Sequence, residues 1–195
     1  MAVAEGGHGG VAHGQGQAGL TVRDLAIGAA CACKDGAMPT QPAMEIDENI
    51  IYRVTIGTDR GDIVMDLDPR IAPVSVNNFI VLARQGYYDG LSFHRVEPGF
   101  VIQGGCPQGS GTGGPGYKFA DEPVQGDYVE GAIAMANSGT DTNGSQFFIC
   151  LGDLRGSLPK QYNLFGQVTG GMDAVKAVRK GDRFTSVTIE ELPAG

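Results

Sequence analysis

The chain has 195 residues, of which 42% are hydrophobic and 18% charged, enough apolar material for one globular domain of ordinary size. Fourteen basic against 22 acidic side chains give a formal net charge of −8, which disfavours binding to nucleic acid or to an anionic membrane. The longest uncharged apolar stretch, Leu25 to Cys33, is far shorter than the ~20 residues that span a bilayer. We therefore expect no membrane span and no nucleic-acid partner.

The N-terminal part differs in composition from the rest. Residues 1–19 contain seven glycines and almost no large apolar side chains, so burial cannot offset the entropy cost of ordering them. A short helix fits residues 20–30, and two prolines then interrupt any regular element. We expect residues 1–46 to form a largely disordered, glycine-rich tail, with a role in binding a partner or a metal ion as a weaker alternative. Residues 47–195 are expected to form the folded domain.

The start of the chain lacks the pattern of a secretory signal, because Arg23 and Asp24 interrupt its apolar stretch. We therefore expect a cytoplasmic protein. The alternative is an extracytoplasmic, tethered form if the true start lies upstream, since Leu25 to Cys31 faintly resembles a lipoprotein cleavage site. The four cysteines lack the ligand spacing of a zinc site, so we interpret them as free thiols and expect no metal.

From residue 50 the pattern becomes regular. Two alternating segments, 50–56 and 63–67, flank turn-forming residues at 58–61 and predict a β-hairpin with one buried face. The 3,4 spacing of apolar residues then predicts an amphipathic helix over about 73–85, which Gly86 can end in left-handed geometry.

Six further short apolar runs are separated by clusters of Gly, Pro, Asn and Asp, as is typical of strands. They lie at 93–96, 99–103, 131–136, 146–151, 164–168 and 185–191. A second helix fits Met172 to Arg179. About eight strands, two helices and no regular strand–helix alternation favour an antiparallel barrel or sandwich over a parallel sheet.

One glycine-rich segment formally matches a nucleotide-binding motif. Gly109 to Gly114 has the GxGxxG pattern, but Pro115 and Gly116 follow where a helix must begin, so we expect no nucleotide site. We interpret the segment as a tight surface connection whose small residues leave room beside a neighbouring groove.

Four motifs occur in one order and spacing: FHRVEPGFVIQGG at 93–105, GTGGPGY at 111–117, MAN at 135–137 and NGSQFFI at 143–149. In these motifs the sequence resembles the cyclophilin family of peptidyl-prolyl cis-trans isomerases, in its compact bacterial form, from about Ile50 to Leu192. The resemblance implies a mainly β fold, a closed eight-stranded antiparallel barrel capped by two α-helices, with the N-terminal tail outside it. It implies no cofactor.

The resemblance also implies which residues form the site. Arg95, Phe100 and Gln103 match the family's catalytic residues. The implied substrate-binding residues are Val101, Ala136, Asn137, Gln146, Phe148, Leu158 and Tyr162.

The chemistry of the reaction suits an arginine. Resonance of the nitrogen lone pair gives an X-Pro bond its double-bond character and resists rotation. A guanidinium aimed at the prolyl nitrogen can hydrogen-bond the lone pair once it leaves resonance in the twisted state, while interacting weakly with the planar amide. By the resemblance, that residue is Arg95.

The remaining residues divide between an apolar pocket and polar contacts. Phe100 and Phe148 resemble the aromatic walls that hold the proline ring, with Leu158 and a short Val101 beside them. The resemblance implies that both glutamines bond the substrate backbone and orient the arginine, and that main-chain groups at 136–137 meet an extended peptide. His94 is expected to be structural and hydrogen-bonded within the barrel.

Two departures from the family concern inhibitor binding. The chain has no tryptophan, and Ser157 or its neighbours lie where many cyclophilins carry the tryptophan that holds cyclosporin. Tyr162 replaces a histidine at the pocket edge, in an alignment that needs a one-residue insertion. We expect weak cyclosporin binding together with retained catalysis.

The leading hypothesis is an isomerase that acts on X-Pro bonds in unfolded or flexible polypeptides, as a folding catalyst. The alternative is a non-catalytic domain that binds proline-containing segments as a chaperone or scaffold. Intact Arg95 argues against the alternative, because binding alone needs no transition-state donor. A monomer is expected, since no apolar heptad pattern is visible.

Overall fold

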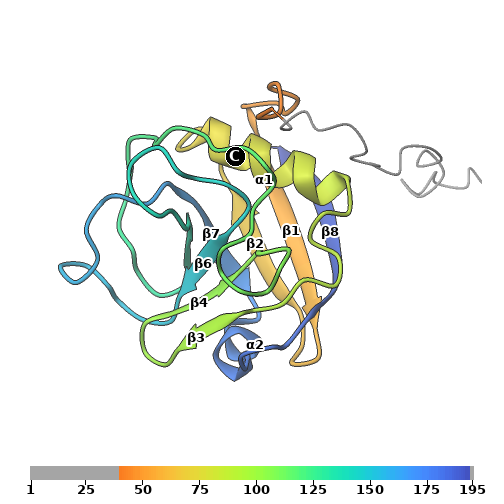
Figure 1. Ribbon diagram of the computed structural model, residues 1–195, viewed down its shortest axis with the longest axis vertical. Coiled ribbons are helices and arrows are strands. Elements are labelled where there is room, and N and C mark those ends of the chain that lie inside the picture. The colour runs from red at the N-terminus through yellow and green to blue at the C-terminus, as the bar shows by residue number, and fades with distance from the viewer. Residues whose placement is uncertain (1–39, 194–195) are drawn as a thin grey trace, which may run out of the picture. The chain divides into compact units, whose positions relative to one another are not determined.

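A computed structural model describes residues 40–193 of the chain. These residues form eight strands and two helices (Figure 1). In chain order they are β1 (Ile50–Thr58), β2 (Ile63–Leu67), α1 (Pro73–Arg84), β3 (Arg95–Glu97), β4 (Val101–Gly104), β5 (Ala132–Met135), β6 (Phe147–Cys150), β7 (Leu164–Gly170), α2 (Met172–Ala177) and β8 (Phe184–Pro193). The predicted mainly β fold is confirmed. The helix expected at 20–30 lies outside the described residues.

The first hairpin follows the alternation of its sequence. Strands β1 and β2 pair antiparallel with Val54 opposite Met65, and alternate side chains of both strands are buried. The turn is closed by Thr58, whose side-chain hydroxyl bonds the carbonyl of Gly61 at 2.7 Å. The hairpin therefore forms one wall of the interior from local sequence signals alone.

All eight strands belong to one antiparallel sheet in the order β3-β4-β6-β5-β7-β2-β1-β8. The expected closure of the barrel is less regular than the resemblance implied, because the two edge strands β3 and β8 do not share a ladder. The segments just before them meet instead through a bridge between Ser92 and Arg183, and Phe93 N–H donates to Asp182 O at 3.0 Å. Strand β3 has three residues, too few to run along β8.

The two helices lie at opposite ends of the sheet (Figure 1). Helix α1 buries Val76 and Phe79 against the strands. Its first residues lack a local side-chain cap; Glu122, from a distant loop, accepts the N–H groups of Val74 and Ser75 at 2.9 Å. A carboxylate at this position satisfies two of the free N–H groups and complements the positive end of the helix.

A short segment before β1 is held against α1. Asn77 on the helix accepts the N–H of Glu45 and donates to the carbonyl of Ala43, both at 2.8 Å. Ile46, next in the chain, is 9% exposed and packs with the interior residues. In the described part of the chain, contacts with α1 therefore begin no later than residue 43.

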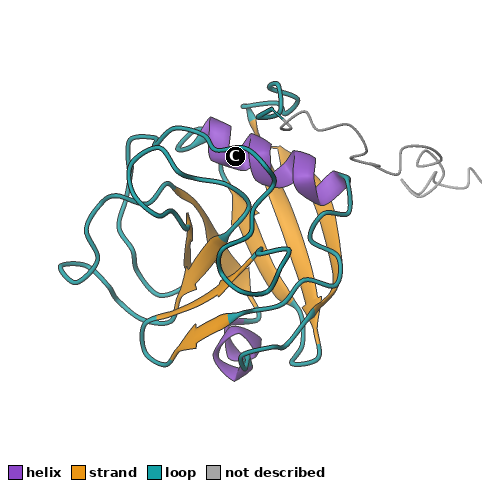
Figure 2. Cartoon of the chain, in the orientation of Figure 1, coloured by secondary structure: helices purple, strands orange, loops and turns teal. Residues whose placement is uncertain are grey.

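The apolar residues form two separate clusters. The barrel core fills the interior and contains most large side chains, including Phe79, Tyr88, Phe147 and Phe184. The outer cluster lies on the other face of β4, β5 and β6 and consists of Val101, Tyr128, Ala132, Ala134, Phe148, Cys150, Leu154 and Leu164. Every residue of β5 and β6 is buried, because alternate residues face the barrel core and the outer cluster. Figure 2 shows the long loops that connect the strands. No helix in residues 40–193 is long and apolar enough to cross a membrane.

Candidate active site

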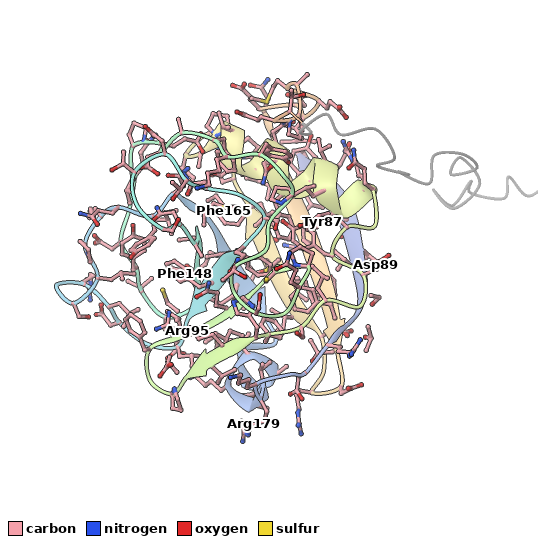
Figure 3. All side chains as sticks on the ribbon, viewed as in Figure 1. Tyr87, Asp89, Arg95, Phe148, Phe165 and Arg179 are labelled. Atoms are coloured by element: carbon pink, nitrogen blue, oxygen red, sulfur yellow. The ribbon has the colours of Figure 1, made fainter. Side chains whose placement is uncertain are left out.

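Strand pairing places the predicted catalytic residues in one row across the sheet. Arg95 on β3 lies opposite Gln103 on β4, which lies opposite Phe148 on β6, which lies opposite Ala134 on β5. Paired residues project to the same face of a sheet. The row therefore runs from a cation through an amide to the apolar outer cluster. Figure 3 labels two members of this row, Arg95 and Phe148.

Arg95 lies at the exposed end of this row. Its Nη1 donates to Gln103 Oε1 at 3.4 Å, and its Nε lies 3.6 Å from Glu97 Oε1. Both partners of the ion pair are about half exposed, at 48% and 54%, so the pair contributes little energy and can yield to a substrate. Arg95 Cζ lies 6.0 Å from the centre of the Phe100 ring, within cation–π distance. Sequence reasoning did not identify the contact with Glu97.

The predicted pocket residues all pack on the outer cluster. Phe100, Leu158 and Tyr162 are partly buried against it, while Val101 and Phe148 belong to it. The rings of Phe148 and Tyr162 meet edge to face with centroids 5.4 Å apart. This geometry makes a stiff apolar surface with one side open to solvent.

The floor of the surface includes residues that the sequence did not reveal. Tyr128 anchors the loop at the pocket edge, since its hydroxyl donates to the carbonyl of Tyr162 at 2.7 Å and accepts that residue's N–H. Burial raises the pKa of the Cys150 thiol to about 12 and also raises the pKa of Tyr128. Both groups are therefore neutral at physiological pH and add no charge to the outer cluster.

The two glutamines form a hydrogen-bonded chain that ends in a loop. Gln103 Nε2 donates to Gln146 Oε1 at 3.0 Å. Gln146 Nε2 in turn donates to the carbonyls of Gly111 and Gly113 at 2.9 and 2.8 Å. These glycines belong to the glycine-rich loop, residues 107–116. The predicted orientation of Arg95 by glutamine corresponds to an observed contact, and the loop anchors the far end of the chain.

Residues 136 and 137 lie beside this chain of contacts. The Ala136 N–H is used internally, donating to Gln146 O at 2.9 Å. Asn137 Nδ2 donates to Gln161 O at 2.8 Å and so holds the loop that carries Tyr162. Both residues line a cleft of 840 Å³ together with Gln103, Gln146 and the glycine-rich loop. The groove expected beside this loop is thus present, and contact of 136–137 with substrate stays a prediction.

The expectation for His94 is wrong in one respect. Its Nδ1 is buried with no hydrogen-bond partner among the described residues, although the residue was expected to be bonded within the barrel. The ring lies against Gly111 instead. Desolvation, assisted by the positive charges of Arg95 and Lys180, lowers the pKa of His94, which favours the neutral ring.

No group of His, Cys, Asp and Glu side chains within residues 40–193 is arranged to hold a metal ion. Cys106 and Cys150 are free thiols, as expected, whereas Cys31 and Cys33 lie outside the described residues. What the site offers chemically is therefore one exposed cation, two amides and a neutral apolar surface, a combination suited to hydrogen bonding and binding.

Comparison with known proteins gives one consistent family. A family model described as cyclophilin type peptidyl-prolyl cis-trans isomerase/CLD matches residues 53–192. A peptidyl-prolyl cis-trans isomerase of Helicobacter pylori is 44% identical over 137 residues, covering 68% of this chain and 83% of that protein. Peptidyl-prolyl cis-trans isomerase B of Bacillus subtilis is 46% identical over 134 residues, 68% of this chain and 93% of that one.

Solved structures agree with the sequence matches. The crystal structure of a cyclophilin type peptidyl-prolyl cis-trans isomerase of Cryptosporidium parvum matches with a TM-score of 0.67 and 31% identity, covering 73% of this chain and 99% of that one. A second structure of that protein, in the presence of the dipeptide Ala-Pro, matches with a TM-score of 0.61. The predicted family and enzyme class are confirmed: the chain belongs to the cyclophilin-type peptidyl-prolyl cis-trans isomerases.

Proposed function

We propose that this isomerase accelerates rotation about X-Pro bonds in unfolded or flexible polypeptides by a hydrogen bond from Arg95 to the prolyl nitrogen in the twisted transition state. The observation that carries the proposal is the row in which Gln103 separates the exposed guanidinium from the apolar surface at Phe148. A proline ring bound on that surface brings its nitrogen toward the arginine.

Such a contact supplies about half of the energy required, and binding of the twisted peptide supplies the rest. The barrier to X-Pro rotation is ~18–20 kcal/mol, and exchange takes tens to hundreds of seconds. Millisecond exchange needs an acceleration of roughly 10⁴ to 10⁵, which is about 5.5–7 kcal/mol at ~1.36 kcal/mol per decade. No covalent bond forms or breaks, so stronger binding of the twisted state than of the planar state is sufficient.

The apolar residues supply the binding half of this mechanism. Phe100, Val101, Phe148, Leu158 and Tyr162 hold the ring of the proline, and their packing against one another supports a fixed position for it. A ring held in place lets the chain on the N-terminal side of the bond turn past Arg95. This is the motion that isomerisation requires.

The polar residues hold the rest of the peptide. Gln103 and Gln146 bond substrate main-chain groups, and residues 136–137 lie along the cleft where an extended segment fits. Main-chain recognition selects little by side chain, so the partners are proline-containing polypeptides of varied sequence.

Cyclosporin binding is weak in this proposal. Ser157 or its neighbours lie where the family carries the tryptophan, and Ser157 is exposed and donates its hydroxyl to Leu154 O at 3.2 Å, so it offers no broad indole surface there. A nanomolar inhibition constant for cyclosporin would contradict this. The proposal further places the protein in the cytoplasm as a monomer, which fractionation of cells and sedimentation of the purified chain can test.

The direct test is cis-trans exchange in a short Ala-Pro peptide, followed by NMR with equal concentrations of the wild-type chain and of Arg95→Ala. We expect fast exchange that falls about 10²- to 10³-fold in the variant, as for loss of a transition-state donor. Arg70→Ala is the matched control, since Arg70 is also exposed and paired, with Asp68, outside the site. Peptide binding without accelerated exchange by the folded wild type would favour a scaffold instead.

A further inference from the structure

The glycine-rich loop is built around the sulfur of Cys106. This residue lies two positions after the last residue of β4 and is 1% exposed. Its Sγ accepts the backbone N–H of Gly111 at 3.2 Å and that of Gly113 at 3.3 Å. One side chain therefore satisfies main-chain donors from two points of a loop that has no regular secondary structure.

The same two glycines connect the sulfur to the active site. While their N–H groups point to Cys106, their carbonyls accept both hydrogens of Gln146 Nε2. Gln146 then accepts from Gln103, and Gln103 accepts from Arg95. A continuous series of hydrogen bonds thus runs from the buried thiol to the guanidinium.

A loop of this composition needs an internal support. Residues 107–116 contain five glycines, and Gly109 and Gly111 have positive φ angles of 63° and 85°, so the free chain has many accessible conformations. The sulfur also fills the space beneath the loop, because a Cβ added at Gly113 would lie 3.2 Å from it. Removing the sulfur leaves a void and two N–H groups without an acceptor.

The N–H groups around the sulfur also shift the pKa of the Cys106 thiol. Burial alone would raise the pKa of Cys106, but backbone N–H groups from Gly113, Gly111, Gln108 and Ser110 more than offset burial, and the pKa lies below its ordinary value. The donors around the sulfur therefore favour a strong acceptor at this position.

We propose that Cys106 is a positioning residue: by fixing the carbonyls of Gly111 and Gly113 it orients the side chain of Gln146, and through Gln103 it sets the direction of Arg95. The inference rests on the proposed role of Arg95 in catalysis. Cys106 does not touch the substrate, so its effect falls on the rate of the bound complex and less on binding.

The experiment compares Cys106→Ala and Cys106→Ser in the full-length chain. In the NMR exchange assay, Cys106→Ala is expected to lower kcat about three- to tenfold with KM changed less than about twofold. Cys106→Ser keeps an acceptor and is expected to restore most of the rate. Val175→Ala, a cavity variant on α2 outside the hydrogen-bonded series, is the stability control. Thermal unfolding verifies that every variant is folded at the assay temperature.

A double-mutant cycle separates this inference from the function it rests on. In the Arg95→Ala background, Cys106→Ala is expected to have no further effect on exchange, because it acts through the arginine. An unchanged kcat in folded Cys106→Ala overturns the positioning role. So does a decrease in the exchange rate on adding Cys106→Ala to Arg95→Ala that is as large as the decrease in the wild-type background. An unchanged rate in Arg95→Ala alone overturns the proposed mechanism instead.

The side-chain amide resonances of Gln146 give a readout besides activity. We expect them to shift or broaden in Cys106→Ala and to stay near their wild-type positions in Cys106→Ser and Val175→Ala. Equal shifts in Cys106→Ala and in Val175→Ala would indicate a general structural effect and contradict the proposal.

Discussion

The barrel core and the outer cluster are formed in part by the same strands, but they differ in what borders them: the predicted pocket residues Phe100, Leu158 and Tyr162 pack on the outer cluster. In β6, Phe147 and Ile149 face the core while Phe148 and Cys150 face the outer cluster. Core rings pack closely, with Phe79 and Tyr88 stacked at 4.6 Å. The outer cluster is bordered by partly buried side chains that include four of the predicted substrate-site residues, Phe100, Ala136, Leu158 and Tyr162. Alternate residues of one strand therefore belong to two different apolar clusters, of which the outer one carries the predicted substrate site.

This division teaches that stability and activity should respond to different substitutions. A side chain enclosed on all sides contributes its full burial energy to folding. A side chain on the open surface contributes less to folding and retains an apolar area for a ligand. The following changes test that separation, beginning with the largest expected effect.

The largest effect is expected for a barrel-core aromatic. Phe79→Ala removes a fully buried ring that contacts Tyr88, Phe147 and Phe165, and should lower the free energy of unfolding by about 3–5 kcal/mol. Urea unfolding followed by circular dichroism measures the loss. The folded fraction should keep its wild-type kcat/KM, and a lowered value would show that core and site are coupled.

The second effect concerns the segment held on α1. Deleting residues 1–46 removes buried Ile46 and both hydrogen bonds to Asn77, which should lower the free energy of unfolding by about 2–3 kcal/mol. Isomerase activity per folded molecule should be unchanged. Deletion of residues 1–39 alone is the control and should alter neither quantity. Equal stability of the two truncated chains would mean that these contacts add nothing.

The third change tests the outer surface. Phe100 is partly buried, so Phe100→Ala should lower the free energy of unfolding by less than about 1 kcal/mol while kcat/KM falls about tenfold, or about 1.4 kcal/mol. Exchange spectroscopy and urea unfolding measure the two. Met44→Ala, which removes a 48% exposed apolar side chain outside the site, should change neither. A stability loss as large as that of Phe79→Ala would erase the distinction between the two regions.

The smallest effect is a pH dependence at the end of β2. The hydrogen bond from Arg70 lowers the pKa of Asp68 below its ordinary value of 3.8, although partial burial opposes this. A lowered folded pKa means stability that is present above the ordinary value and lost as the pH falls through the folded one. Asp68→Asn should therefore cost less than about 1 kcal/mol at about pH 6 and still less near about pH 3. Urea unfolding at both values checks this, and a pH-independent difference would contradict it.

Much of the fold could be predicted because its signals are local. The alternation at 50–56 and 63–67 and the 3,4 spacing after Pro73 depend on neighbouring residues, and all three elements are present. Whether the sheet closes into a continuous barrel could not be predicted from such local patterns, and the edge strands β3 and β8 do not pair. Edge closure depends on the lengths of β3 and β8, which follow from packing.

The site was predictable in its membership but not in its geometry. Motifs identified Arg95, Gln103 and Phe148, and their roles stay predictions until the exchange assay is done. Their alignment in one row depends on the registers of three strands, which single-strand patterns do not specify. Glu97, Tyr128 and the sulfur of Cys106 carried no local signal.

By itself, the sequence determined the element types, the apolar face of each element and the family, because periodicity, turn residues and motifs are properties of adjacent positions. Only the tertiary structure decided that Glu122 caps α1 from 47 to 48 residues away, that the thiol of Cys106 accepts two N–H groups of the glycine-rich loop, and that the same loop accepts both hydrogen bonds of the Gln146 amide. These contacts join residues far apart in the chain, and their partners are selected by the packing of the whole domain.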